Sequence, residues 1–128
     1  MKLTKYSKNR FFTSLNKYGV ILEWGDVLYN YFVFGYQPGS FLTALLANDA
    51  RDMIAHSHPS NSIEAMKSVV TWLNGELISG IGFGSYPAVK KWLAMTPKKR
   101  RRILEDLNLI YSEEQEIMMV LKDEPESF

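Results

Sequence analysis

The amino-acid sequence predicts an all-α protein. Apolar residues recur at helical spacing through most of the chain, and glycine or proline separates the apolar stretches. A serine or threonine stands where several of these stretches begin, as is typical of helix N-caps. We therefore expect a compact single domain of five to six helices. Residues 18–34 are the exception, because they also fit a small β-hairpin.

The composition excludes several classes of protein. The chain has 128 residues, enough for one domain whose core needs no metal or disulfide. It has no cysteine, which excludes disulfides, thiolate nucleophiles and cysteine zinc sites. The net charge of +1 gives no overall attraction to nucleic acid. No apolar run approaches the ~18 residues of a membrane span, so we expect a cytoplasmic protein that has no membrane partner and needs no cofactor.

Three parts are expected along the chain. Residues 1–9 form a loose, basic N-terminal arm, residues 10–121 form the single helical domain, and residues 122–128 form an acidic C-terminal tail. The first helix is expected over residues 10–18. Further helices are expected to begin near Ser40, near Ser60 or Ser62, and near Ser85, Thr96 and Ser112.

The sequence also predicts where one of these helices ends and how another begins. The helix that begins at Ser40 is expected to run to about Ser57, because Pro59 disfavours a helical residue before it. Ser112 and Gln115 match a capping box and open the last helix. The apolar residues of that last helix are Ile117, Met118 and Leu121.

The stretch of residues 18–34 leaves two structures open. Both of its halves are rich in β-branched and aromatic residues, and Gly25-Asp26 between them suits a two-residue hairpin turn. In the other interpretation Asp26 caps a helix, on which Leu28, Tyr31 and Phe32 form one apolar stripe.

An ordered pattern of residues runs through the middle of the chain. It comprises Gly35-x-x-Pro38-Gly39-x-Phe41-Leu42-Thr43-Ala44, then Trp72-Leu73, Gly84-Ser85 and Trp92-Leu93. Over residues 27–95 this pattern resembles a family of small uncharacterised proteins encoded by bacteriophages and prophages. The resemblance implies helices on both sides of the Pro38-Gly39 turn, and so favours a helix for residues 27–34. It also implies a role in infection, and it supplies no catalytic residues.

A run of five basic residues follows Pro97 within a predicted helix: Lys98, Lys99, Arg100, Arg101 and Arg102. Cations in the first turns of a helix oppose the helix dipole, which suggests that a partner requires them. Phosphate or an acidic surface would suit them, and Lys90 and Lys91 could extend the patch. The alternative is an ordinary solvated face that nearby acidic residues neutralise.

Aromatic residues are concentrated between positions 24 and 41. Most are expected in the core. The surplus predicts an exposed patch of Trp24, Tyr29 and Tyr36 that binds a partner or a second copy in a homodimer.

One set of residues suggests an enzyme. Asp49, Asp52 and His56 share a face if they lie on one helix, and could hold a divalent metal or act as an acid–base pair. The interpretation that we adopt is an exposed polar face with a helical contact between Asp52 and His56. We therefore expect neither a metal site nor catalytic residues.

These observations favour a non-enzymatic, phage-derived binding protein. We expect it to modulate or inhibit a host protein or nucleoprotein machine, for example a defence or replication complex. The alternative is an accessory or regulatory protein that binds DNA or RNA through the basic helix of residues 97–107.

Overall fold

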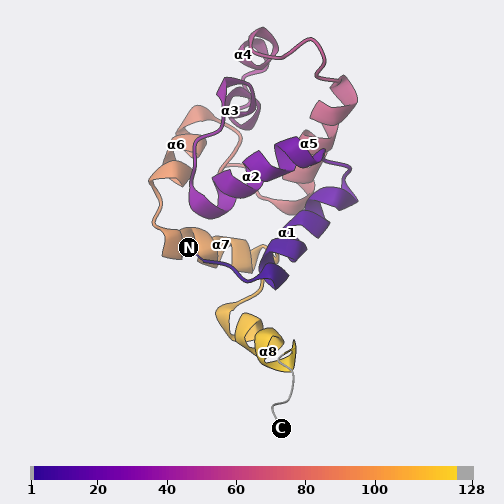
Figure 1. Cartoon of the computed structure of the whole chain (residues 1–128). Helices are drawn as coiled ribbons and strands as arrows, with labels where there is room; N and C mark the ends of the chain where they lie inside the picture. Colours follow the sequence, from indigo (N-terminus) through magenta and orange to yellow (C-terminus); the bar gives the residue numbers. More distant parts are fainter. Residues whose placement is uncertain (1, 124–128) are drawn as a thin grey trace.

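Eight α-helices make up the computed structural model, which describes residues 2–123, and no strand occurs in that range. The helices are α1 (Lys5–Lys17), α2 (Leu22–Phe34), α3 (Ser40–Leu46), α4 (Ala50–Ala55), α5 (Ile63–Glu76), α6 (Tyr86–Ala94), α7 (Pro97–Asp106) and α8 (Glu113–Asp123). Figure 1 shows α2 in the middle of the body, α3 and α4 at one end, and α8 projecting from the other. The prediction of an all-α fold is confirmed for this range, whereas the expected number of helices was too low.

Residues 22–34 form α2, so the hairpin alternative is wrong. Helix α2 is apolar on nearly all sides, as expected of a helix in the centre of a domain, and Leu28, Phe32 and Val33 have no exposed surface. The expected turn residue Gly25 lies inside the helix, where an added Cβ would stand 3.4 Å from Leu15 of α1. Burial of the apolar sides of α2 has overridden the strand preference of these residues, and Glu23, Asp26 and Asn30 form the one exposed polar stripe of the helix.

The N-terminal arm is shorter than expected, because α1 begins at Lys5 and not near Arg10. Thr4 is its N-cap, and the Thr4 side chain accepts a hydrogen bond from the backbone N–H of Ser7 at 3.4 Å. At the other end, Lys122 and Asp123 of the expected tail belong to α8. The rest of that tail, residues 124–128, lies outside the described residues, as does Met1.

The single helix expected over residues 40–57 is two helices, α3 and α4. Between them Asn48 has φ of 60°, in the left-handed region that asparagine tolerates better than most residues. Asp49 then caps α4 by accepting a hydrogen bond from the backbone N–H of Asp52 at 3.1 Å. The left-handed conformation of Asn48 therefore ends α3, and the cap formed by Asp49 starts α4.

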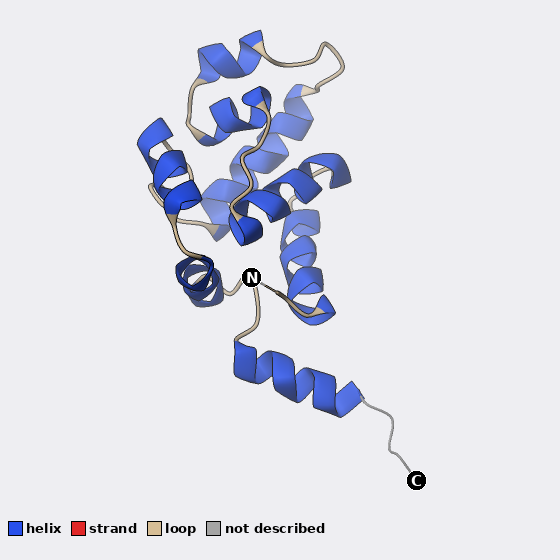
Figure 2. Cartoon of the chain, turned by 60° about the vertical axis from the view of Figure 1, so that its left-hand side comes forward, coloured by secondary structure: helices blue, strands red, loops and turns tan. Residues whose placement is uncertain are grey.

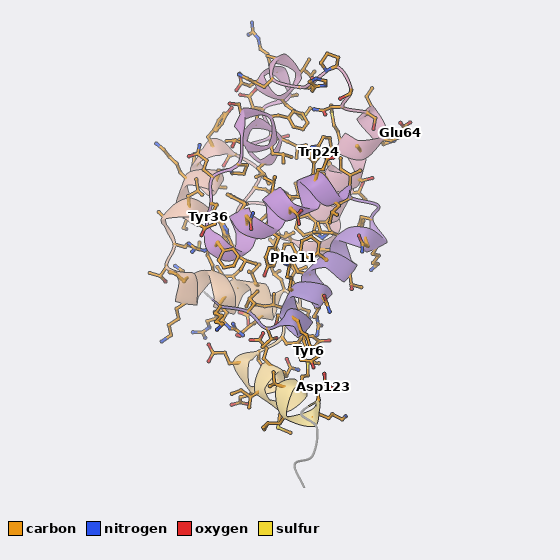
Figure 3. The ribbon with its side chains drawn as sticks, viewed as in Figure 1. Tyr6, Phe11, Trp24, Tyr36, Glu64 and Asp123 are labelled. Carbon is orange, nitrogen blue, oxygen red and sulfur yellow. The ribbon has the colours of Figure 1, made fainter. Side chains whose placement is uncertain are left out.

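Aromatic rings from four helices meet around Phe32 in the core. Its ring centroid lies 5.6 Å from that of Trp72 on α5 and 5.5 Å from that of Trp92 on α6. The Trp92 Nε1–H donates to the carbonyl of Tyr31 at 3.1 Å, and the buried Tyr31 hydroxyl donates to the carbonyl of Gly82 at 2.7 Å. Figure 3 shows Phe11 of α1 reaching the same region, where its ring contacts Trp72 at 5.7 Å. These contacts hold α6 and the loop before it against α2.

The loop before α6 contains a glycine that no other residue can replace without strain. Gly82 has φ of 80°, and an added Cβ would lie 2.8 Å from Cε1 of Phe32. We expect Gly82→Ala to lower the free energy of unfolding, measured in urea, by more than Gly80→Ala does. Gly80 also has a positive φ, of 95°, but nothing lies within 4 Å of an added Cβ, so its replacement costs only roughly 1–2 kcal/mol of backbone strain. Equal losses in the two variants would show that the contact with Phe32 relaxes freely.

Candidate partner-binding surfaces

The basic run divides between the interior and the surface. Arg100 and Arg101 are only 5% and 8% exposed, whereas Lys98, Lys99 and Arg102 face solvent. Residues one and two positions apart on a helix point in different directions, so a continuous run cannot form a single binding face. The prediction that all five bind a partner is therefore wrong for Arg100 and Arg101.

Arg100 caps the end of α2. Its Nε–H donates to the carbonyl of Val33 at 3.4 Å, and its Nη2 donates to the carbonyl of Phe34 at 3.2 Å. The last carbonyls of a helix lack partners within the helix and carry partial negative charge, which a cation satisfies. Gly35 makes room for this contact, because an added Cβ would lie 2.8 Å from the guanidinium carbon. Burial lowers the pKa of Arg100, and its three hydrogen bonds go to backbone carbonyls, including that of Met95.

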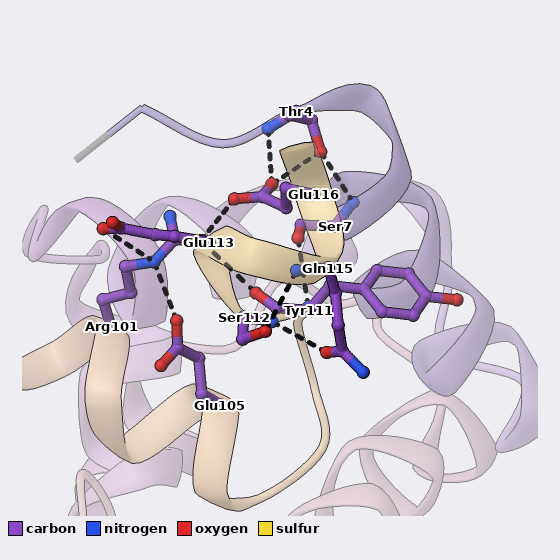
Figure 4. A network of polar contacts seen from close by, with 9 residues as sticks. All are labelled: Thr4, Ser7, Arg101, Glu105, Tyr111, Ser112, Glu113, Gln115 and Glu116. Carbon is purple, nitrogen blue, oxygen red and sulfur yellow. Dashed lines mark hydrogen bonds and ion pairs between the residues drawn. The ribbon is translucent and has the colours of Figure 1, made fainter. Parts of the chain in front are cut away.

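Arg101 binds carboxylates of its own chain. Its Nη2 donates to Glu116 Oε1 on α8, and its Nε–H donates to Glu105 Oε1 at 3.0 Å (Figure 4). Nη2 also donates to the carbonyl of Tyr111 at 3.3 Å. Burial alone would lower the pKa of Arg101, but the hydrogen bonds to Glu116 and Glu105 outweigh it and raise that pKa. The positive charge of Arg101 is thus neutralised by carboxylates of the same chain.

Glu116 joins the N-terminal segment, α7 and α8. It is 5% exposed, and its Oε2 accepts hydrogen bonds from the backbone N–H of Thr4 at 2.8 Å and from the Thr4 hydroxyl at 2.5 Å (Figure 4). Burial would raise the pKa of Glu116, but the hydrogen bonds from Thr4 and Arg101 lower it below the usual range. These contacts connect three parts of the chain, and they pair the buried charge of Glu116 with that of Arg101.

The remaining cations of α6 and α7 form an exposed group that we call the basic face. Its members are Lys90, Lys91, Lys98, Lys99 and Arg102. None of them forms an ion pair with a carboxylate of residues 2–123. Both helices contact α2, through Trp92 and Arg100, and Figure 1 shows α6 at the left of the body with α7 following directly below it.

The expected aromatic patch does not form. Tyr29 is buried, with its ring 5.4 Å from that of Phe11. Trp24 is half-buried against Phe41, at 5.3 Å between ring centroids. Of the three predicted residues, Tyr36 alone is largely exposed, at 63% (Figure 3). Trp24 and Tyr29 lie five positions apart on α2 and therefore point in different directions.

An apolar surface that the sequence analysis missed lies on α8. Four of its side chains are between 39% and 66% exposed: Ile117, Met118, Val120 and Leu121. Ile117, Met118 and Leu121 were identified from the sequence as apolar residues of the last helix, but not as an exposed surface. The sequence did carry a signal, because residues 117–121 are five successive apolar residues, which surround most of a helix and cannot all face one body.

The residues considered for catalysis have structural partners. Asp49 is the N-cap of α4, and its second carboxylate oxygen accepts a hydrogen bond from the Tyr86 hydroxyl at 2.7 Å. The backbone N–H of Asp52, and then Tyr86, hold the pKa of Asp49 below its usual range. Asp52 lies 3.7 Å from His56, both half-exposed. Within residues 2–123, no three His, Cys, Asp or Glu side chains come together in a way that could hold a metal.

Searches of protein-family models, curated proteins and solved structures found no match to this chain. The resemblance of residues 27–95 to phage proteins therefore stays a prediction. In residues 2–123, no helix has both the length and the apolar character to cross a membrane. Two surfaces remain for function: the basic face and the apolar side of α8.

Proposed function

We propose that this protein acts by binding and not by catalysis, and that its basic face engages an acidic surface of a host protein or nucleoprotein machine. In the phage context that the resemblance implies, this binding modulates or inhibits the machine, for example a defence or replication complex. The observation that supports the proposal is the basic face itself, five exposed cations without an ion pair in residues 2–123.

Two physical features of the basic face support a binding role. Lys98 and Lys99 stand in the first turn of α7, where the helix dipole disfavours cations, so they do not serve the stability of the helix. The buried Arg100 and Arg101 fasten α7 to α2 and α8, which holds the exposed cations on a rigid support. Exposed charges on a rigid element steer a partner of opposite charge and select its orientation.

A second candidate is an accessory or regulatory protein that binds DNA or RNA. The exposed side of α7 favours it, because Lys98 and Arg102 lie one turn apart and Lys99 lies beside them. Such a row can contact successive phosphates without reading bases. This binding would weaken steeply with salt, since each phosphate contact releases counterions.

The structure decides how the basic face should be tested. Reversing the whole run from Lys98 to Arg102 would remove the cap of α2 and the partner of Glu116, and would confuse unfolding with lost binding. We therefore choose Lys98→Glu/Arg102→Glu, which changes exposed residues only. The matched control is Arg51→Glu/Lys67→Glu, with the same change in charge at exposed positions on α4 and α5.

The measurement is fluorescence anisotropy of labelled single-stranded DNA, duplex DNA, RNA and a polyglutamate peptide, at low and physiological salt. If the target is nucleic acid, we expect Lys98→Glu/Arg102→Glu to weaken binding and to reduce the salt slope by about 2, while the control keeps both. Binding to polyglutamate alone would favour an acidic protein surface. If the unmodified protein binds none of these probes at low salt, the basic face is a solvated surface and the proposal fails.

A further inference from the structure

Helix α8 has four apolar side chains that remain 39–66% exposed within residues 2–123. Figures 1 and 2 show from two directions that α8 projects from the body. Its start is well formed, since the Ser112 hydroxyl accepts from the N–H of Gln115 at 3.2 Å and the Gln115 side chain accepts from the N–H of Ser112 at 3.0 Å. A helix of 11 residues is marginal alone in water and requires packing partners.

The exposed residues are spaced as in a helix–helix seam. Glu114, Ile117, Met118 and Leu121 follow one another at i, i+3, i+4 and i+7, so they share one side of α8. Glu116 does not belong to this side, because it points into the body toward Thr4 and Arg101. The apolar seam and the contact with the body thus lie on different sides of α8, so the helix can bind a second helix while Glu116 stays bound to Thr4 and Arg101.

The charges along this side are self-complementary. Glu114 stands at the start of α8 and Lys122 stands near its end, whereas the neighbouring Glu113 lies 3.6 Å from Arg101 Nε of its own chain. In an antiparallel pair of identical helices, the acidic start of each helix faces Lys122 of the other. The positive end of each helix dipole then also lies beside the negative end of the other, which is favourable. A parallel pair would bring the glutamates together. Asp123 does not disturb this pairing, because it lies on the other side of α8. It follows Glu114 by nine residues, which is about two and a half turns of the helix.

We propose that α8 pairs antiparallel with α8 of a second copy of this chain, in a two-fold symmetric homodimer. Ile117, Met118 and Leu121 form the apolar centre of the interface, and Glu114 meets Lys122 of the second copy at both ends. The self-complementary order of charges favours a second copy over a foreign partner, because an isologous interface places the same surface on both sides. A seam of this length is small, so we expect a dissociation constant of about 1–100 μM.

The dimer goes beyond the proposed function and does not depend on it. If both hold, the dimer carries two basic faces, and a target with two acidic sites would bind more tightly through effective concentration. A failure of the anisotropy test would leave the dimer untouched, and a monomer would leave the basic face untouched.

The first test is the mass in solution, by sedimentation equilibrium from about 1 μM to about 1 mM. The chain has a mass of 14.8 kDa, and we expect the mass to rise toward twice that value with concentration. Ile117→Glu/Leu121→Glu should stay monomeric. The matched control is Ile54→Glu/Ile63→Glu, which places two charges on exposed apolar residues of α4 and α5 and should dimerise normally. A monomer at every concentration, or a dimer that survives Ile117→Glu/Leu121→Glu, overturns the proposal.

The second test is the orientation of the helices. Lys122→Glu and Glu114→Lys, each alone, should weaken the dimer several-fold, because each places like charges at both ends of the seam. Combining the two changes in one chain restores opposite charges across the interface and should recover most of the affinity. If the double variant is no better than either single variant, the antiparallel arrangement is wrong.

Discussion

Glu116→Ala is expected to lower the free energy of unfolding by about 3–5 kcal/mol, as breaking a buried ion pair does. The change removes the buried carboxylate that pairs with Arg101, leaving it the more exposed Glu105 and Glu113, and leaves the backbone N–H of Thr4 without its acceptor. Urea unfolding at pH 7 measures the loss. The matched control is Glu64→Ala on α5, which removes an exposed carboxylate outside the proposed dimer interface and should change the free energy by less than about 0.5 kcal/mol.

The effect of Glu116 should depend on pH in a defined direction. Its folded-state pKa lies below the ordinary value of 4.5, so its stabilising contribution is complete above that pH and is lost as the pH falls through the folded pKa. The difference in unfolding free energy between the unmodified protein and Glu116→Gln should therefore be constant near neutral pH and shrink on acidification below about 4.5. A difference that grows on acidification would contradict the pairing of Glu116 with Thr4 and Arg101.

Trp92→Ala is expected to lower the free energy of unfolding by about 3–5 kcal/mol. Trp92 has no exposed surface, packs on Phe32 and donates a hydrogen bond to the carbonyl of Tyr31, so its loss opens a cavity and leaves that carbonyl with one partner fewer. Thermal unfolding followed by circular dichroism measures the effect. Tyr36→Ala is the control, because it removes a large aromatic ring that is mostly exposed. Similar losses in both variants would contradict the placement of Trp92 at the centre of the core.

Helix boundaries set by short-range contacts could be predicted from the sequence. Ser85 and Thr96 cap α6 and α7 by accepting from backbone N–H groups three residues later, as expected. The capping box of Ser112 and Gln115 opens α8 in the same way. In each case the residue and its partner lie within one turn, so the local sequence contains the whole interaction.

The candidate surfaces could be predicted only in part. The basic residues of α6 and α7 were predictable from the sequence, and five of them are exposed: Lys90, Lys91, Lys98, Lys99 and Arg102. The inward direction of Arg100 and Arg101 was not predictable, because the partners that bury them on α2 and α8 lie outside their own helix. The carbonyls of Val33 and Phe34 satisfy Arg100, and Glu116 satisfies Arg101.

By itself, the sequence determined the all-α class and most helix starts, because helical periodicity and capping act over three or four residues. The tertiary structure decided between hairpin and helix for residues 22–34, since burial of most of the apolar side chains of α2 outweighs their strand preference. The tertiary structure also decided which cations of α6 and α7 are exposed and which apolar side chains of α8 remain in contact with solvent. Those outcomes depend on contacts such as that between Thr4 and Glu116, 112 positions apart, which no local pattern contains.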